Sequence, residues 1–577
     1  MNRHALQHIQ KSNYAYGVNK ETLCIRLRAA QNDLTKVEII YADKFDMDHF
    51  LIKEMNKILS DGLFDYYETH IGMAQNRYVY YFKLYKGEEV VFFGENGVEE
   101  TLDSKTLHYS VFQFPFLHQI DTHQIPRWCK NAIFYQIFVE RFFDGDPTNN
   151  PENIRKWGEL PTGHSYYGGD LRGIIKKLDY LQDLGINALY LTPIFEANTN
   201  HKYDTKDYMR IDPAFGTQED LKELVEKAHK KGIYIVLDAV FNHCGYHFAP
   251  FQDVLEKGKA SKYFDWFHIS GDKVTTSPAN YLRFAFSNNM PKLNTSNKEV
   301  QDYLLGVATY WIKECDIDGW RLDVSDEIDH AFWRKFREAV KSVKQEALIL
   351  GENWHDAYAW LQGDQYDGVM NYGVTKACLD FFAYNNIEAN EFAYALSNIL
   401  VRNSEHANTC MLNLLDSHDT ARILTLCKGN KDKVKLALTF LMSFVGMPCT
   451  YYGTEIAMEG ENDPDCRRTF DWNEANWDDT FHDYYKKIIS IRKEYKPLTI
   501  GDVRFTYEED IFVMERCYEH EKVVVVINNS EDERVYPLEP KGEMKELLTD
   551  KLIKKDDALN QVIKPYQAKL YYVVDKV

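Results

Sequence analysis

The chain has 577 residues and a formal net charge of −20, and 45% of its residues are hydrophobic. So acidic a protein lacks the basic surface that neutralises phosphates, and we expect no nucleic-acid partner. The N-terminal segment has no apolar core of a secretory signal, and no apolar stretch of about 18 residues follows, so we expect a cytoplasmic protein without a membrane partner. The ten cysteines show no Cys-x-x-Cys spacing, which favours buried, reduced thiols.

Residues 1–122 have the pattern of β-strands. Apolar residues alternate with polar ones in residues 22–28, and aromatic or β-branched runs follow in residues 77–85 and 89–93 with polar turns between them. Helical periodicity is scarce in this segment. We therefore predict an N-terminal β-sandwich.

From residue 123 the sequence alternates between short apolar strands and amphipathic helices. One such helix has apolar residues at helical spacing from Leu171 to Leu181 and ends before Gly185. The expected strands cover residues 133–139, 188–192, 233–240, 319–324, 348–352, 368–372, 411–415 and 449–452. Eight parallel strands close a barrel, so we predict a (β/α)8 TIM barrel formed by residues 123–243 and 298–497.

Two further units complete a multidomain α/β protein. Residues 244–297 separate the third barrel strand from its helix and are too long for a simple turn, so we predict an inserted domain B that shapes the active site. Strand patterns return in residues 511–516, 522–528 and 570–574. We expect residues 498–577 to form a C-terminal antiparallel β-domain.

Three acidic residues, Asp323, Glu352 and Asp419, follow expected barrel strands at their C-terminal ends. These ends meet at one rim of a parallel barrel, where active sites form. A pair of carboxyl groups can cleave a glycosidic bond when one attacks the anomeric carbon and the other protonates the leaving oxygen. Arg321, on the same strand face as Asp323, would keep that residue ionised. A single such acid is more often a salt bridge or helix cap, but three together favour catalysis.

Four short motifs give a more specific resemblance. They are Asp-Ala-Val-Phe-Asn-His at 238–243, Gly-Trp-Arg-Leu-Asp at 319–323, Gly-Glu-Asn-Trp at 351–354 and Leu-Leu-Asp-Ser-His-Asp at 414–419. In order and spacing they resemble the four sequence regions of the α-amylase family. The resemblance implies that Asp323 is the nucleophile, Glu352 the general acid/base, and Asp419 a third carboxylate that binds sugar hydroxyls. It also implies contacts with the cleaved glucose from His243, Arg321 and His418.

A fifth motif, Met-Pro-Lys-Leu-Asn at 290–294, narrows the resemblance to the cyclomaltodextrinase, neopullulanase and maltogenic amylase group. Residues 244–254 and 462–468 are also similar to that group. The resemblance implies that Tyr203 stacks under the bound glucose, that Trp354 forms an apolar wall on the leaving side, and that Glu327 influences water access. The other substrate-binding residues that it implies are Phe286, Asp465 and Arg468.

Two polar loops resemble a calcium site found in some relatives. Hard oxygen ligands gathered in short loops suit Ca²⁺, although a polar turn without metal is an alternative. The implied ligands are Asp144, Asp146, Asn149, Asn150, Gly168 and Asp170. Such an ion would be structural, because the hydrolysis itself needs no metal or other cofactor.

The resemblance implies a retaining α-glucan hydrolase that cuts α-1,4 bonds of cyclomaltodextrins, linear maltodextrins and pullulan, with sugar transfer as a side reaction. An α-1,6-cleaving or glucose-releasing relative, and a catalytically silent carbohydrate-binding protein, are the alternatives. Relatives use the N-terminal domain to pair with a second subunit, which implies a homodimer. Asn353 and the pair Ser325-Asp326 depart from the apolar residue and the Ala-Asn usual in relatives, which leaves the balance of hydrolysis and transfer open.

Overall fold

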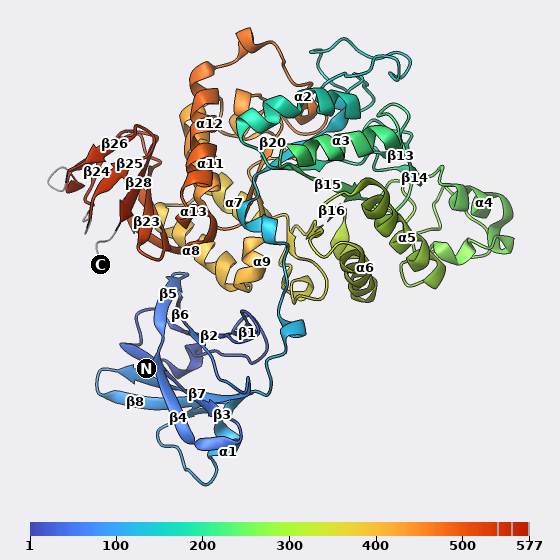
Figure 1. Ribbon diagram of the computed structural model, residues 1–577. Helices are drawn as coiled ribbons and strands as arrows, with labels where there is room; N and C mark the ends of the chain where they lie inside the picture. Colours follow the sequence, from blue (N-terminus) through green and yellow to red (C-terminus); the bar gives the residue numbers. More distant parts are fainter. Residues whose placement is uncertain (539–541, 555–557, 575–577) are drawn as a thin grey trace.

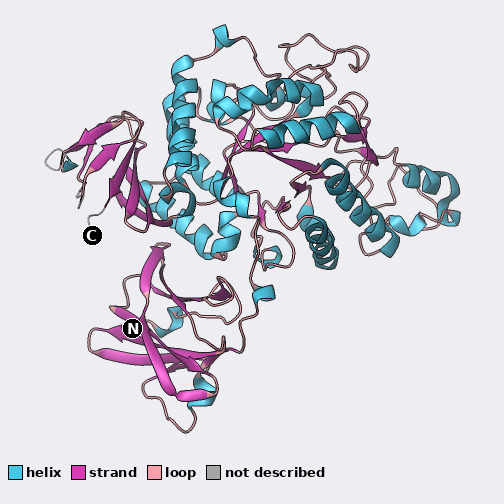
Figure 2. Ribbon diagram, viewed as in Figure 1, coloured by secondary structure: helices cyan, strands magenta, loops and turns pink. Residues whose placement is uncertain are grey.

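The computed structural model describes residues 1–538, 542–554 and 558–574. A blue N-terminal β-domain lies below a central barrel, and the red C-terminal sheet lies to one side of it (Figure 1). Strands dominate the two terminal domains, whereas helices surround the central one (Figure 2). In the part of the chain that is described, no helix combines the length and apolar character needed to cross a bilayer.

The N-terminal domain consists of two antiparallel sheets, as predicted. One has the order β1-β2-β6-β5 and the other β4-β3-β7-β8-β9, with β10 on β7. Leu27, Ile39 and Phe82 are fully buried in the core of this domain. The strands are Ala15–Gly17 (β1), Leu23–Ala30 (β2), Lys36–Asp43 (β3), Asp46–Glu54 (β4), Asn56–Ser60 (β5), Phe64–Ile71 (β6), Tyr78–Lys86 (β7), Glu89–Gly94 (β8), Gly97–Glu99 (β9) and Phe112–Phe114 (β10).

The central domain contains the predicted eight-stranded parallel barrel. Its strands are Phe134–Ile137 (β11), Ala188–Leu191 (β12), Tyr234–Ala239 (β15), Gly319–Leu322 (β16), Leu348–Gly351 (β17), Gly368–Val369 (β18), Leu412–Leu414 (β19) and Met447–Tyr451 (β20). Their order is β18-β17-β16-β15-β12-β11-β20-β19. A parallel bridge between Met370 and Leu412 joins the two ends of this order and closes the barrel.

Amphipathic helices cover the outside of the barrel. In α2 the Asp170 side chain accepts a hydrogen bond from the Gly173 amide, and the helix ends at Gly185, whose φ of 95° favours glycine. The larger helices are Leu171–Leu184 (α2), Gln218–Lys230 (α3), Lys298–Cys315 (α5), His330–Val343 (α6), Tyr372–Cys378 (α7), Ala389–Val401 (α8), Lys431–Ser443 (α11) and Asp479–Glu494 (α12). The short ones are Glu405–Thr409 (α9), Ile423–Leu426 (α10) and Pro497–Ile500 (α13), whereas Leu107–Ser110 (α1) lies in the N-terminal domain.

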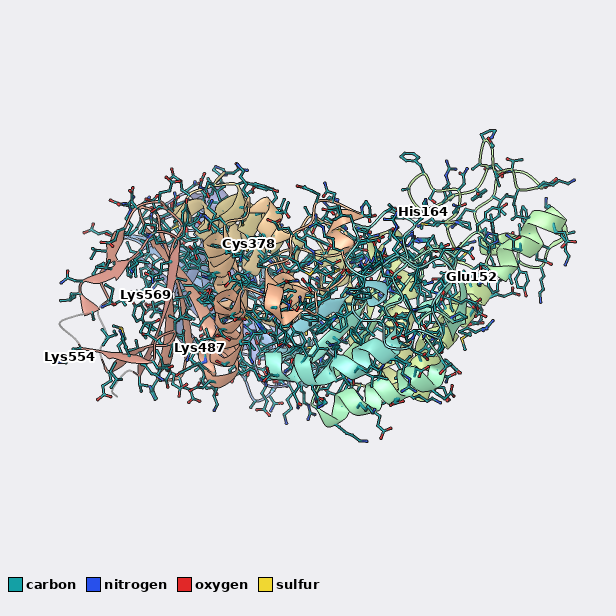
Figure 3. The ribbon with its side chains drawn as sticks, turned by 90° about the horizontal axis from the view of Figure 1, so that it is seen from above. Glu152, His164, Cys378, Lys487, Lys554 and Lys569 are labelled. Atoms are coloured by element: carbon teal, nitrogen blue, oxygen red, sulfur yellow. The ribbon has the colours of Figure 1, made fainter. Side chains whose placement is uncertain are left out.

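Long connections extend the C-terminal rim of the barrel. The connection between β15 and α5 contains helix α4 (Ala249–Lys257) and returns to the rim through a bridge between His243 and Lys292. A second excursion lies between β11 and α2, where the sequence predicted only two polar loops that resemble a calcium site. Its residues Glu152 and His164 lie at the far end of the molecule from Lys554 and Lys569 of the C-terminal domain (Figure 3). Between β12 and α3 a hairpin forms from Phe195–Ala197 (β13) and Thr205–Ile211 (β14).

The C-terminal domain is an antiparallel β-domain, as predicted. Its main sheet has the order β21-β22-β23-β28-β25-β26, and β24 pairs with β27. The buried Arg516 guanidinium donates to the carbonyls of Ser443, Leu498 and Gly501 at 2.7–3.0 Å and so joins this sheet to the barrel domain. The strands are Asp502–Glu508 (β21), Ile511–Tyr518 (β22), Glu521–Asn528 (β23), Arg534–Tyr536 (β24), Met544–Glu546 (β25), Lys551–Ile553 (β26), Gln561–Ile563 (β27) and Gln567–Val574 (β28).

Candidate active site

A cavity of about 450 Å³ lies at the C-terminal rim of the barrel. A larger hollow of about 710 Å³ on the N-terminal domain is lined by a single carboxylate, Glu21, so it lacks the pair that glycoside cleavage requires. The rim cavity is lined by His201, Tyr203, His243, Phe284, Met290, Asp323, Val324, Asp326, Glu327, Glu352, Trp354, Asp419, Asp463 and Arg467. All three carboxylates that the sequence singled out therefore line one cavity.

Strand register places the first two carboxylates side by side. Leu322 at the end of β16 pairs with Gly351 at the end of β17, and the next residue on each strand is the acid. Val324, directly after Asp323, has φ 47° and ψ 43°, a left-handed conformation that is strained for a β-branched residue. Its amide donates to Oε2 of Glu352 at 3.0 Å. The strained turn after the nucleophile position thus helps to orient the second acid.

Arg321 connects three carboxyl groups beneath the cavity. Its Nη1 donates to both oxygens of Asp238 at 3.1 Å and to Oδ1 of Asp323 at 2.9 Å, and its Nη2 lies 2.8 Å from Oε2 of Glu352. Burial raises the pKa of Asp238 to about 6, against the opposing effect of Arg321. Burial likewise raises the pKa of Asp323, and Arg321 counteracts it. One guanidinium thus faces three buried carboxyl groups, and the pKa values of Asp238 and Asp323 are raised despite its charge.

Asp323 and Glu352 differ at the carboxylate oxygen that Arg321 does not contact. Oδ2 of Asp323 is buried and has no hydrogen-bond partner. Oε1 of Glu352 accepts from the indole Nε1 of Trp354 at 3.2 Å. A nucleophile needs a carboxylate oxygen without a hydrogen-bond partner, and Oδ2 of Asp323 meets this need. Oε1 of Glu352 can exchange its hydrogen bond with the indole of Trp354, which lines the cavity, for one with a sugar oxygen.

Asp419 is the most accessible of the three, with 30% of its side chain exposed. Arg467 lies 3.4 Å from its Oδ1 and also pairs with Asp463 at 3.0 Å. Both partners line the cavity, so this side of the site offers charged donors and acceptors to sugar hydroxyls.

His243 lines the cavity with a free nitrogen. Its ring stacks on Phe284, with 4.9 Å between centroids and 20° between planes, and its Nε2 is buried without a partner. Burial, with a further contribution from Lys292, lowers the pKa of His243 to about 3, so the ring is neutral at pH 7. A neutral imidazole with an unpaired nitrogen can hydrogen-bond a sugar hydroxyl.

His418 lies behind Tyr203 and does not line the cavity. The two rings are parallel, with centroids 5.6 Å apart. Gln136 approaches Nδ1 of His418 at 2.7 Å, and Nε2 lies 2.6 Å from the Tyr203 hydroxyl, which itself donates to Asp238 at 3.0 Å. Both imidazole nitrogens are therefore occupied, and His418 holds Tyr203 in place.

Three other residues named from the sequence lie outside the cavity. Phe286 is 91% exposed, and Phe284 lines the cavity in its place. Asp465 and Arg468 pair with each other at 2.6 Å. A 3-10 turn at Asp465–Arg467 points Arg467 inward, so the cavity receives Asp463 and Arg467. The motif contains two aspartates and two arginines, and spacing alone could not choose between them.

Glu327 lines the cavity, as expected. It contacts Lys292, a residue to which the sequence analysis assigned no role. Lys292, the lysine of the Met-Pro-Lys-Leu-Asn motif, lies 2.9 Å from Oε2 of Glu327 and donates to its carbonyl at 3.1 Å. The same ammonium contacts Oδ1 of Asn242. Domain B is thereby joined to the loop that follows the nucleophile position.

The loops singled out for calcium contain unpaired oxygens. Oδ1 atoms of Asp144, Asn149 and Asn150 are buried without hydrogen-bond partners, and Asn150 donates to Asp144 at 2.9 Å. A Cβ on Gly168 would lie 2.2 Å from Oδ1 of Asn150, so only glycine leaves room there. These hard oxygens fit a calcium ion.

The two remaining carboxylates of this group have other partners. Asp170 accepts hydrogen bonds from the amides of Gly145, Asp146 and Gly173, and Asp146 accepts one from Thr148.

Comparisons with known proteins agree with this geometry. The family model described as "Alpha amylase, catalytic domain" matches residues 136–500, and "Alpha amylase, N-terminal ig-like domain" matches residues 1–118. A cyclomaltodextrinase of Geobacillus thermopakistaniensis is 47% identical over 99% of this chain and 100% of its own length. Neopullulanase 2 of Thermoactinomyces vulgaris is 42% identical over 98% and 99%.

A solved structure titled cyclomaltodextrinase is also similar. It superposes with a TM-score of 0.92 at 40% identity and covers 100% of this chain and 98% of its own. The catalytic-domain match spans more than half of the chain, and the relatives match nearly all of it. The chain therefore belongs to the alpha-amylase family of glycoside hydrolases.

Proposed function

We propose that the protein is a retaining α-glucan hydrolase that cleaves α-1,4-glucosidic bonds of cyclomaltodextrins, linear maltodextrins and pullulan. The observation that carries this proposal is the cavity in which Asp323, Glu352 and Asp419 converge, with one oxygen of Asp323 unpaired. Relatives named cyclomaltodextrinase, maltogenic alpha-amylase and neopullulanase support the substrate class. No catalytic carboxylate is missing, which disfavours a silent binding protein.

The reaction has two steps. In the first, Oδ2 of Asp323 attacks the anomeric carbon while Glu352 gives its proton to the leaving glycosidic oxygen, and a covalent glycosyl ester forms. In the second, Glu352 takes a proton from water, the resulting hydroxide equivalent attacks the anomeric carbon, and Asp323 leaves. Each step inverts the anomeric carbon, so the released sugar keeps the α configuration.

The other cavity residues fix the glucose that is cleaved. Asp419 and Arg467 bind hydroxyls on one side, and Nε2 of His243 accepts or donates a hydrogen bond on another. The Tyr203 ring forms the platform beneath the sugar. Trp354 stacks on Tyr372 with centroids 3.8 Å apart, which supports the indole as an apolar wall for the leaving sugar.

Replacement of either reacting group tests the mechanism. Asp323→Asn removes the nucleophile and Glu352→Gln removes the acid, so each should reduce kcat on the order of thousands-fold or more while the fold persists. Circular dichroism and thermal denaturation check the fold. Near-normal turnover in either variant, or β-anomeric product detected by NMR during fresh hydrolysis, would contradict the assigned roles.

A parallel substrate assay tests specificity. β-Cyclodextrin, pullulan, maltotriose and soluble starch are offered at equal mass, and products are identified by chromatography. We expect faster turnover of cyclodextrin and maltotriose than of starch, with maltose as the main product and panose from pullulan. Glucose as the sole product, or isomaltose-type bonds as the preferred substrate, would favour the glucose-releasing or α-1,6-cleaving alternative.

We also propose that one structural Ca²⁺ binds through Asp144, Asn149, Asn150 and the backbone at Gly168. The unpaired buried oxygens support this assignment. After a chelator has removed calcium from the wild-type chain, added Ca²⁺ should raise its thermal midpoint of unfolding. The same addition should raise the midpoint of Asp144→Asn by less. An equal rise in both proteins, or none in the wild type, would argue against the site.

The exposed edge of the N-terminal domain supports the proposal of a homodimer. Phe45, Leu51 and Ile52, on and next to strand β4, are exposed apolar residues. The double variant Phe45→Glu/Ile52→Lys should sediment as a monomer where the wild type sediments as a dimer. An unchanged sedimentation coefficient would count against pairing through this edge.

A cytoplasmic location is the last part of the proposal. All ten cysteines are free thiols, which suits a reducing compartment, and a Bacillus subtilis relative is named intracellular maltogenic amylase. Cell fractionation tests it, since the activity should stay with the cytosol.

A further inference from the structure

A thiol, a carboxylate and an imidazole meet on one face of the N-terminal domain, remote from the cavity. Cys24 of β2 lies directly opposite His70 of β6, and Glu68 is two residues before His70 and so points to the same face. One ligand atom from each of the three lies within 4.8 Å of the others. Among the residues that the structure describes, this is the one such group of three.

A fourth donor comes from the barrel domain. Glu405 begins helix α9, and its Oε2 lies 3.9 Å from Nε2 of His70. The amide of Glu405 donates to the Tyr16 hydroxyl at 3.3 Å, and Tyr16 pairs with Cys24 across β1 and β2. The four donors therefore lie where the N-terminal sheet meets the barrel.

We propose that Cys24, Glu68, His70 and Glu405 bind one Zn²⁺ ion. Sulfur, nitrogen and oxygen donors together suit this borderline metal, which takes four ligands in a tetrahedron in structural sites. Ligand atoms around such an ion are about 3.5 Å apart, so the present spacing of up to 4.8 Å must shorten when the ion binds. The side chains of His70 and Glu405 are 44% and 43% exposed, which gives the ion a path from solvent.

The charges at the site favour a divalent cation. Arg26 pairs with Oε2 of Glu68 at 2.7 Å and leaves Oε1 available. With a neutral thiol and imidazole, Arg26, Glu68 and Glu405 sum to −1. Binding of Zn²⁺ with loss of the Cys24 proton to solvent brings the sum to zero.

The ion would act as a clamp between two domains. Arg26 already donates to the carbonyl of Val401 at 2.8 Å, and Asn13 donates to the same carbonyl at 2.8 Å. A zinc ion would add a bond from strands β2 and β6 to the start of α9. Metal binding to the folded state alone stabilises it by mass action.

The test uses the full-length chain, stripped of metal and titrated with Zn²⁺ and with Co²⁺. We expect one equivalent of zinc to survive gel filtration, a thiolate-to-cobalt charge-transfer band in the near ultraviolet, and a higher thermal midpoint with zinc. Cys24→Ser should abolish the cobalt band. His70→Ala, at a side chain that is 44% exposed, should weaken zinc binding roughly 100-fold or more, since even outer partners of a metal ligand are worth about 10–100-fold.

Cys517→Ser is the matched control, because Cys517 is a partly exposed thiol without this group of ligands. It should leave the cobalt band and the zinc stoichiometry unchanged, and hydrolytic activity should be similar in all three variants. Retention of the band in Cys24→Ser, equal zinc affinity in His70→Ala and wild type, or no zinc binding at micromolar concentration would each overturn the proposal.

Discussion

At the scale of single residues, Arg321 determines how the buried carboxyl groups share their charge. It lowers the pKa of Asp323 against the stronger effect of burial, and it reaches Asp238 and Glu352 at the same time. A lysine keeps the positive charge but lacks the planar fork, so it serves fewer carboxyls. We expect Arg321→Lys to lower kcat/KM about 100-fold or more and to move the acid limb of its pH profile upward by about one unit.

The sign follows from the nucleophile, which must be ionised to attack. A weaker cation leaves its pKa higher, so a higher pH is needed to form the carboxylate. Arg422→Lys is the control, because Arg422 is equally buried but donates to the carbonyls of Tyr452 and Cys466. An acid limb that stays in place in Arg321→Lys, or that moves equally in the control, would speak against this role.

Ser325 and Asn353, which both depart from the family pattern, contact each other beside Asp323 and Glu352. Oγ of the buried Ser325 lies 2.9 Å from Oδ1 of Asn353 and 3.0 Å from the carbonyl of Glu352. Ser325→Ala leaves the Asn353 oxygen without its donor, which should cost about 1–3 kcal/mol of stability. In the Asn353→Val variant this oxygen is absent, so adding Ser325→Ala should lower the stability by less.

A double-mutant cycle measures this coupling. Thermal midpoints of the wild type, the two single variants and the double variant are compared, with kcat on maltotriose as a second readout. Additive shifts would mean that the two positions act independently. A smaller combined loss would show that they form one linked pair.

Sequence reasoning predicted Asp323, Glu352 and Asp419 from their positions at strand ends, and all three line the cavity. It named Phe286 and Arg468, whereas Phe284 and Arg467 line the cavity, because the choice depends on turns that sequence spacing does not determine. His418 was expected at the cavity, yet its nitrogens are occupied by Gln136 and Tyr203. Contacts made across the chain, over 200 residues apart, leave no local pattern in the sequence.

At the scale of elements, Lys292 joins domain B to the loop after β16. Its ammonium contacts both Glu327 and Asn242. Lys292→Met keeps the chain length and removes the charge, so it frees both partners. We expect kcat/KM on maltotriose to fall about tenfold and the ratio of transfer to hydrolysis to change, because a loosened rim positions sugar and water less well.

Lys259→Met provides the comparison within domain B. Lys259 pairs with Asp272 of the same domain at 3.0 Å and does not line the cavity. Its kinetics and product pattern should match the wild type. Equal behaviour of the two variants would assign the effect to domain B in general and not to this contact.

The barrel elements were predictable because each has its own local signal. All eight expected strands overlap observed ones, and α2 begins and ends at the cap residues Asp170 and Gly185. The sixth strand is shorter than expected, since Asn371 already caps α7. The extent of the excursion between β11 and α2 was not predicted, because its polar sequence has neither helical nor strand periodicity, and its shape depends on contacts with distant loops.

At the scale of the whole molecule, His123 is a titratable group at the junction between the N-terminal domain and the barrel. It lines a small cavity of about 50 Å³ that residues of both domains enclose. Both of its ring nitrogens are buried without hydrogen-bond partners, and Nε2 lies 4.0 Å from Oδ1 of Asp367. Burial, and then Arg337, lowers its pKa to about 3, while Asp367 acts in the opposite direction. The unfolded chain has an ordinary histidine pKa near 6.5.

This difference makes the fold sensitive to acid. Between pH 6.5 and 3 the unfolded chain binds a proton that folded His123 does not, so stability is complete above pH 6.5 and is lost as the pH falls. At pH 5 the loss is about 2 kcal/mol, from 1.36 kcal/mol per pH unit. His123→Gln removes the titrating ring, so its thermal midpoint should fall less than that of the wild type between pH 7.5 and 5. His520→Gln, at an exposed ring in the turn between β22 and β23, should keep the wild-type slope. Parallel slopes for wild type and His123→Gln would mean that acid weakens the molecule elsewhere than at this junction.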